Sequence, residues 1–186
     1  MVTLYNVDQG SKEWFRLRLN RITGSVAGKL LTTDDPTPLL TEESNFKGNY
    51  YTERGKALEP QARELYNEIF ETDIMEVGFI TNSKYNYAGY SPDGILPDRL
   101  IEIKCFNKQK HIDCLENMPF EVLAQVHFGM MICDLPQCDI VLYNPDLPDE
   151  LAFLVINVKR NEFIERNIKA RLEMLCKSQE LLVATK

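Results

Sequence analysis

The chain has 186 residues, a formal net charge of −7, 44% apolar residues and 26% charged residues. These values are typical of one globular domain covering residues 1–186, and no apolar run is long enough to span a membrane. The five cysteines are odd in number and show no C-x-x-C spacing, which argues against zinc or an iron–sulfur cluster and favours reduced thiols in the cytoplasm. The first residues lack a basic region followed by an apolar core, so no signal peptide is expected.

The first elements predicted along the chain are helical. A helix begins near Ser11, whose side chain suits an N-cap. The run at 23–25, Thr-Gly-Ser, predicts a break and a second helix start, and residues 34–38 predict a loop. Residues 42–70 are mostly helical in pattern, with a kink or a new helix expected at Pro60, because proline lacks the amide donor of a helix interior.

The rest of the chain alternates strand and helix patterns. Strands are predicted at 74–81, 85–90, 100–105, 140–143 and 151–158, helices at 120–132 and 162–182, and an irregular segment at 106–119. The first three strands are expected to be antiparallel. This order predicts an α/β domain with a mixed central β-sheet flanked by helices.

Two carboxylates and a lysine lie on one predicted strand–turn–strand unit. Asp93 follows a turn, and Glu102 and Lys104 come nine and eleven positions later on a strand. Strand side chains alternate, so Glu102 and Lys104 point to one face while Ile101 and Ile103 point to the other. Carboxylates bind a hard cation, and a lysine positions water or neutralises developing charge. The unit therefore suits a metal-dependent phosphodiesterase.

Each of these residues also has an ordinary structural explanation. An aspartate such as Asp93 in a Pro-Asp-Gly turn often bonds its own backbone, and Glu102 with Lys104 suits a solvated strand face. Glu59 is either an exposed helix acid or an additional metal ligand. Gln125, on a mostly apolar helix face, is either satisfied by backbone groups or holds a phosphate or the attacking water. The conjunction of these pieces is rarer than any one of them and favours the functional interpretation.

Five blocks, in this order, carry a resemblance to a known family. The set resembles the phage lambda exonuclease and YqaJ-type viral recombinase family of the PD-(D/E)XK nuclease superfamily, from about Trp14 to about Met130. It implies a restriction-endonuclease-like core. The blocks are Trp14…Arg18…Ile22-Thr23-Gly24-Ser25, Gly55…Leu58-Glu59…Ala62-Arg63, Ser91-Pro92-Asp93-Gly94, Glu102-Ile103-Lys104 and Ala124-Gln125-Val126.

The resemblance implies a role for each residue of the cutting site. Asp93, Glu102 and the backbone carbonyl of Ile103 would hold the catalytic Mg²⁺. Glu59 would reach a second metal or its water shell, and Lys104 would position and activate the water. These ligands are all oxygens, which Mn²⁺ would also accept.

The resemblance also implies a binding site for a DNA terminus. Four residues match family positions that hold the terminal 5′-phosphate or the adjacent backbone: Arg18, Ser25, Ser91 and Gln125. A guanidinium gives bidentate phosphate contacts, and hydroxyl and amide donors fix orientation. The segment around Arg21 departs from the lambda enzyme, and Arg21 either adds a phosphate contact or is a solvated charge at a helix end.

The resulting expectation is a single nuclease domain that acts as an Mg²⁺-dependent 5′→3′ exonuclease on linear double-stranded DNA. It would leave 3′ single strands for a single-strand annealing protein, in a phage or prophage context and in the cytoplasm of a bacterial host. The resemblance also implies a homo-oligomer, with a ring trimer as its form in the lambda enzyme. Two alternatives stay open: an endonuclease of the same superfamily, for restriction or junction resolution, and a noncatalytic DNA-end-binding protein.

Overall fold

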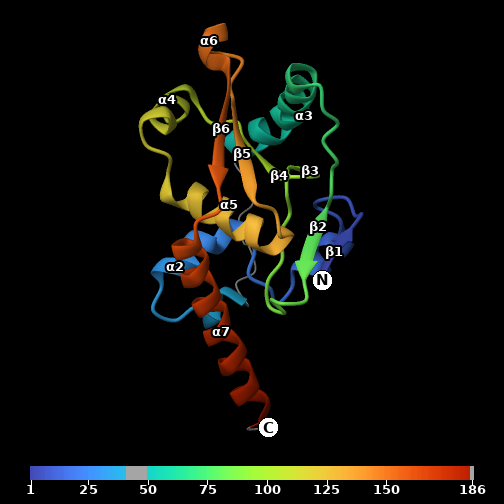
Figure 1. The fold of residues 1–186 in the computed structure, drawn as a ribbon, viewed down its shortest axis with the longest axis vertical. Helices are drawn as coiled ribbons and strands as arrows, with labels where there is room; N and C mark the ends of the chain where they lie inside the picture. Colours follow the sequence, from blue (N-terminus) through green and yellow to red (C-terminus); the bar gives the residue numbers. More distant parts are fainter. Residues whose placement is uncertain (41–49, 185–186) are drawn as a thin grey trace.

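The computed structural model describes residues 1–40 and 50–184 and contains a four-stranded sheet between helices (Figure 1). The strands are β1 Val2–Tyr5, β2 Phe79–Asn82, β3 Gly94–Leu96, β4 Arg99–Lys104, β5 Gln137–Tyr143 and β6 Phe153–Lys159. The α-helices are α1 Lys12–Arg18, α2 Ala27–Thr32, α3 Tyr50–Phe70, α4 Lys108–Glu116, α5 Phe120–Cys133, α6 Asp149–Ala152 and α7 Glu162–Ala184, and the 3₁₀ turns are η1 Gly24–Val26 and η2 Thr37–Leu40.

The central sheet has the strand order β3-β4-β5-β6. Strands β4 and β5 are parallel, whereas β3 pairs with β4 and β6 pairs with β5 in antiparallel fashion. The parallel pair needs a crossover connection, which α4 and α5 supply. Strands β1 and β2 form a separate antiparallel ribbon.

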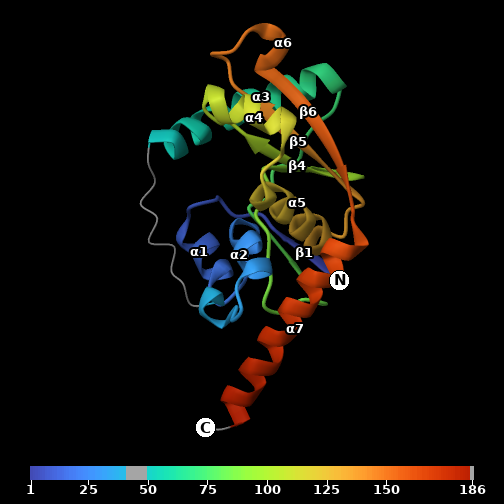
Figure 2. The same cartoon turned by 90° about the vertical axis from the view of Figure 1, so that its left-hand side faces the viewer.

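The two faces of the central sheet pack against different helices, and Figure 2 shows the sheet between α3 and α5. Leu100 and Ile140 belong to the larger buried cluster, which includes the buried side chains of α5. Ile101 and Ile103 belong to a smaller cluster with Tyr66 of α3. Adjacent β4 residues thus point to opposite faces, and the predicted mixed sheet flanked by helices is confirmed.

The helix α7 begins against the core and then extends away from it. Its Ile168, Leu172 and Leu175 are buried with the larger cluster, and its C-terminal end projects from the molecule (Figures 1 and 2). Within the described residues, no helix combines the length and the apolar character needed to cross a membrane.

Several predicted elements are correct in kind, with shifted bounds. The helix near Ser11 is α1, and the Ser11 side chain accepts a hydrogen bond from the Trp14 amide. The helix predicted at 42–70 is described from Tyr50 onward, and its first residues lie outside the described chain. Pro60 does not break α3; it is exposed, so water can bond the carbonyl that its missing amide leaves unpaired.

Two predictions in the first strands and the following connection were wrong, and one strand was missed. Residues 85–90 form no strand, because this segment pairs with its neighbours only through single bridges, at Ala88 to Ile22 and at Tyr90 to Ile80. Residues 106–119 contain the helix α4, whose N-cap Asn107 accepts from the Lys110 amide. The strand β1 had no counterpart in the prediction, and it forms by pairing with β2, distant in sequence.

Candidate active site

The β4 strand presents Glu102 and Lys104 on the face covered by α5. The buried Glu102 carboxylate accepts three hydrogen bonds. Lys104 Nζ and Gln125 Nε2 each lie 2.6 Å from Oε1, and the Tyr90 hydroxyl donates to Oε2. Gln125, on α5, also accepts from Lys104 Nζ at 3.1 Å. Residues predicted from three separate motifs therefore meet in one network.

Asp93 lies at the edge of β4, directly before β3. Its Oδ2 accepts from the backbone amide of Ile103 at 2.6 Å. The amide and carbonyl of one strand residue point to the same side, so the Ile103 carbonyl also faces the Asp93 edge. Arg63 of α3 donates from Nε and Nη2 to the Asp93 backbone oxygen at 3.1 and 3.0 Å. The turn that carries Asp93 is thereby tied to both the sheet and α3.

Glu59 of α3 adds a third acid on this side of the molecule. It lines, with Asp93 and Arg63, a cavity of about 240 Å³. Burial raises the pKa of Glu59, and the charge of Glu102 raises it further although Arg63 opposes this. Burial likewise raises the pKa of Asp93 well above its ordinary value, with the charges of Glu102 and Glu59 adding to it. Three acids therefore repel one another where solvent is scarce.

Lys104 forms an ion pair with Glu102 within this group of acids. Burial lowers the pKa of its ammonium group, but attraction to Glu102 and Asp93 outweighs burial, and the net shift is upward. Lys104 is therefore a charged donor at neutral pH. Arg63 also offsets the charge of Glu59, but it forms an ion pair with Glu76. The two basic groups face four acids in all, which favours a further positive charge.

The donor atoms fit a hard divalent cation. Asp93, Glu102 and the Ile103 carbonyl offer oxygen only, and Mg²⁺ is usually bound by one or two carboxylates while it keeps several waters. In the described part of the chain, no group of three or more His, Cys, Asp or Glu side chains could hold a metal ion by itself. A metal between Asp93 and Glu102 would thus depend on the Ile103 carbonyl and on water, as the family resemblance implies.

A second group of polar side chains gathers around Arg18 of α1. Its Nη1 lies 3.4 Å from Ser91 Oγ and its Nη2 lies 3.3 Å from Thr23 Oγ1. Thr23 Oγ1 is in turn 3.2 Å from Ser25 Oγ. The Trp14 ring supports the group, because its Nε1 donates to Ser91 Oγ at 2.9 Å and the Arg18 guanidinium lies 4.2 Å from its centroid.

Arg18 is partly buried without a compensating acid. No described carboxylate forms an ion pair with it, and burial lowers the pKa of its guanidinium. A guanidinium among hydroxyl groups, with its charge uncompensated, is suited to an anion. Arg21 is directed elsewhere, since its Nη1 donates to the Leu17 carbonyl at 2.5 Å, and its phosphate contact stays a prediction.

The acidic group and the Arg18 group lie next to each other in the fold. Gly24, between Thr23 and Ser25, lies so close to the acidic group that a Cβ there would be 2.4 Å from Tyr90 Cε2 and 3.2 Å from Gln125 Cγ. Both of these residues contact Glu102. Ser91 precedes Asp93 by two positions. The turn η1 therefore packs directly on the residues that hold Glu102.

Sequence reasoning gave no role to four residues that hold this site together: Trp14, Thr23, Arg63 and Tyr90. The first three belong to the five sequence blocks that resemble the family, and that membership could have indicated a role at the site. Tyr90 directly precedes Ser91-Pro92-Asp93, and an aromatic residue next to a site turn is a weak signal, because it equally indicates a core residue.

The chain is similar to known proteins in sequence and in structure. The family model of the YqaJ-like viral recombinase domain matches residues 13–136. LHK-Exo in complex with dAMP is similar in structure, with a TM-score of 0.82 and 27% identity over 94% of this chain and 95% of that one. A second structure of this alkaline exonuclease, from Laribacter hongkongensis, gives a TM-score of 0.78 and 29% identity over 94% and 97% of the two chains.

A more distant structure supports the fold alone. The phage related exonuclease from Haemophilus somnus 129PT has a TM-score of 0.63 and 15% identity, over 91% of this chain and 98% of that one. No curated protein matches the sequence significantly. The family model covers well over half of the sequence, and the chain belongs to the YqaJ-like viral recombinase domain family, with a core of the PD-(D/E)XK type.

Proposed function

We propose that the chain is a single-domain, metal-dependent exonuclease that degrades one strand of linear double-stranded DNA in the 5′→3′ direction. The main support is the junction of two groups in one site: the acids with Lys104, and the uncompensated Arg18 among hydroxyls. The similar alkaline exonuclease was crystallised with dAMP, a deoxynucleoside monophosphate. A mononucleotide product is proposed here too.

The acidic group would perform the hydrolysis. Asp93, Glu102 and the Ile103 carbonyl would hold Mg²⁺ or Mn²⁺, and Glu59 would reach a second ion or its waters. When bound, the metal supplies Lewis-acid polarisation of the phosphoryl group and a more acidic water. Lys104 donates to the attacking water or to developing charge on the phosphate. Gln125 holds the Lys104 ammonium through its Oε1 and so directs it.

The Arg18 group would bind the 5′ end. Arg18, Ser25 and Ser91 present a guanidinium and two hydroxyls, and Gln125 adds an amide next to them. Such donors match the oxygens of a terminal phosphate. Ser91 and Asp93 belong to one turn, so a phosphate held by Ser91 would place the first phosphodiester near the acids. This arrangement predicts a preference for 5′-phosphorylated ends.

Membership of the family suggests a biological setting, which we include in the proposal. The 3′ single strand would pass to a single-strand annealing protein during phage recombination, in the cytoplasm of a bacterial host. A homo-oligomer, with a ring trimer as the leading form, would enclose the DNA and place basic side chains inside an acidic exterior. That arrangement would reconcile the net charge of −7 with DNA binding.

The test compares linear duplex carrying 5′-phosphate or 5′-hydroxyl ends with covalently closed circular duplex, each with Mg²⁺ and with excess EDTA. We expect degradation of the linear DNA alone, faster from 5′-phosphate ends and abolished by EDTA. Cutting of closed circles would instead establish the endonuclease. Untouched 5′-phosphorylated DNA in Mg²⁺ or Mn²⁺ would favour the noncatalytic end-binding protein.

A further inference from the structure

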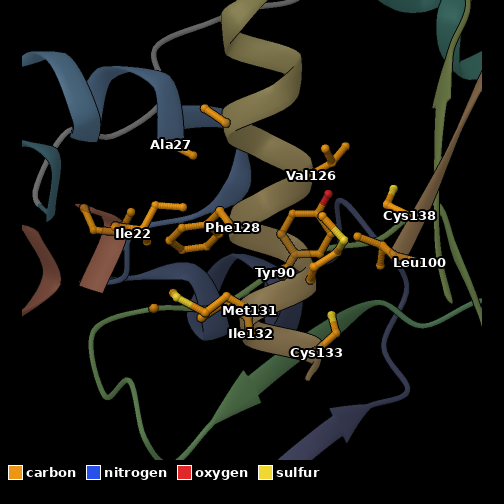
Figure 3. Close-up of a cluster of buried hydrophobic side chains, with 14 of the residues drawn as sticks. Ile22, Ala27, Tyr90, Leu100, Val126, Phe128, Met131, Ile132, Cys133 and Cys138 are labelled. Atoms are coloured by element: carbon orange, nitrogen blue, oxygen red, sulfur yellow. The ribbon is translucent and has the colours of Figure 1, made fainter. Parts of the chain in front are cut away.

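Tyr90 is a core residue whose ring is enclosed by the elements of the site. It is 1% exposed, and Figure 3 shows it between α5 and Leu100. Two glycines make room for it. A Cβ at Gly24 would lie 2.4 Å from its Cε2, and a Cβ at Gly129 of α5 would lie 2.5 Å from its Cζ. The ring therefore has little freedom to move unless η1 or α5 shifts.

The Tyr90 hydroxyl is a polar group at the edge of this apolar cluster. It donates to Oε2 of Glu102, the carboxylate oxygen opposite the one that accepts from Lys104 and Gln125. Lys104 and Gln125 alone would hold Oε1 and leave the carboxylate free to turn about it. The Tyr90 hydroxyl supplies the second point that sets the carboxylate plane.

We propose that Tyr90 is a positioning residue for Glu102. Its immobile ring fixes the orientation in which the Glu102 carboxylate meets a metal beside Asp93, and the same ring supports the η1 turn that carries Ser25. The inference rests on the proposed function, since it assigns Tyr90 a part in the same metal site. Groups that orient a metal ligand without touching the metal commonly affect metal affinity or activity by tenfold to a hundredfold.

A purely structural explanation competes with this one, because a buried tyrosine hydroxyl needs some acceptor. The chain contains a matched example on the other face of the sheet. The Tyr66 hydroxyl of α3 donates to Asp139 Oδ2 of β5 at 2.6 Å, also in a buried position. Asp139 lies outside the proposed metal site. Loss of the Tyr66 hydroxyl therefore removes a buried hydrogen bond from tyrosine to carboxylate and leaves the proposed metal site intact.

The experiment compares Tyr90→Phe with Tyr66→Phe in the full chain. Mg²⁺ binding is measured by isothermal titration calorimetry without DNA, and kcat and KM are measured on 5′-phosphorylated duplex at saturating Mg²⁺. Thermal unfolding without metal and circular dichroism report folding. We expect Tyr90→Phe to weaken Mg²⁺ affinity by at least tenfold and to lower kcat with little change in KM. Tyr66→Phe should lower Tm and leave Mg²⁺ affinity and kcat unchanged.

The outcomes separate the two proposals. If the wild type binds Mg²⁺ and cleaves DNA while Tyr90→Phe matches Tyr66→Phe in Mg²⁺ affinity and kcat, the positioning role is refuted and the proposed function stands. If Tyr90→Phe lowers the metal-free Tm and leaves the Mg²⁺ affinity at the wild-type value, its hydroxyl is structural, and the inference is again refuted. A wild type that neither binds Mg²⁺ nor Mn²⁺ nor cleaves DNA refutes both.

Discussion

Two buried carboxylates on neighbouring strands have the same kinds of partner and differ in their surroundings. Glu102 of β4 accepts from Tyr90, Lys104 and Gln125. Asp139 of β5 accepts from a tyrosine, an arginine and an amide as well: Tyr66 at 2.6 Å, Arg99 at 2.9 Å and Asn157 at 2.6 Å. The two networks lie on opposite faces of the sheet, one toward α5 and the other toward α3.

The difference lies in the charge around each carboxylate. Burial would raise the pKa of Asp139, but the hydrogen bonds from Asn157, Tyr66 and Arg99 outweigh it and the net shift is downward. Beside Glu102 stands Asp93, whose pKa burial and neighbouring acids raise. The Asp139 network, in which donors offset the buried charge, stabilises the fold. A network with surplus negative charge is a place for a cation, so the donor set alone does not separate structure from function.

The largest expected effect comes from replacing Lys104, the basic side chain of the Glu102 network. Arg99, the basic side chain of the Asp139 network, gives the comparison. Lys104→Ala should lower kcat by roughly 10²–10³-fold, the scale for losing one donor to transition-state charge, while DNA binding persists. Arg99→Ala should instead leave kcat within about twofold and cost about 2 kcal/mol of unfolding free energy, since it removes a charged hydrogen bond from Asp139. Single-turnover kinetics, DNA binding by fluorescence anisotropy and urea denaturation measure the three quantities. Equal losses of kcat in both variants would contradict the distinction.

An intermediate effect is expected from Arg18, which contrasts with Arg99. Arg99 pairs with Asp98 and Asp139, whereas no described carboxylate pairs with Arg18. Arg18→Ala should therefore reduce the rate preference for 5′-phosphate over 5′-hydroxyl ends by tenfold to a hundredfold, the scale of charge-assisted hydrogen bonds. Arg16, exposed on the same helix, is the matched control, and Arg16→Ala should keep the preference. An unchanged preference in Arg18→Ala would place the phosphate pocket elsewhere.

The smallest expected effect concerns acid stability. The folded-state pKa of Asp139 is lowered, so its contribution to stability is present above the unfolded-state pKa of about 4 and is lost as pH falls through the lower folded value. Asp139→Asn should cost about 1.5 kcal/mol at pH 7 and make the unfolding free energy less steep below about pH 4. Urea denaturation at several pH values measures both. A slope identical to the wild type below pH 4 would show that Asp139 does not carry this dependence.

Local pattern was enough for the elements with strong periodicity. The alternation along 100–105 placed Glu102 and Lys104 on one face and Ile101 and Ile103 on the other, and the structure has this arrangement. The helix predicted at 120–132 is α5. A long apolar run without proline is a strong helix signal, even with Gly129 inside it.

Two segments were mispredicted because their structure depends on packing that local pattern does not show. The helix α4 buries only His111 and Cys114 and exposes Ile112 and Leu115, so its apolar stripe is too weak to predict. Residues 85–90 look like a strand, yet Gly89 packs so tightly that a Cβ there would lie 2.2 Å from Phe79 Cζ. This segment packs against Phe79 of β2 and does not form the regular hydrogen bonds of a paired strand.

For the site, the sequence by itself determined which chemical groups are available and that Glu102 and Lys104 share a face, because strand periodicity is local. Only the tertiary structure decided which groups meet. Arg18 and Ser91 are 73 positions apart and Gln125 and Glu102 are 23 apart, and both contacts arise from packing of α1 and α5 against the sheet region. The enclosure of Tyr90 between Gly24 and Gly129 likewise requires three distant segments to pack together. Local sequence patterns do not predict such close packing.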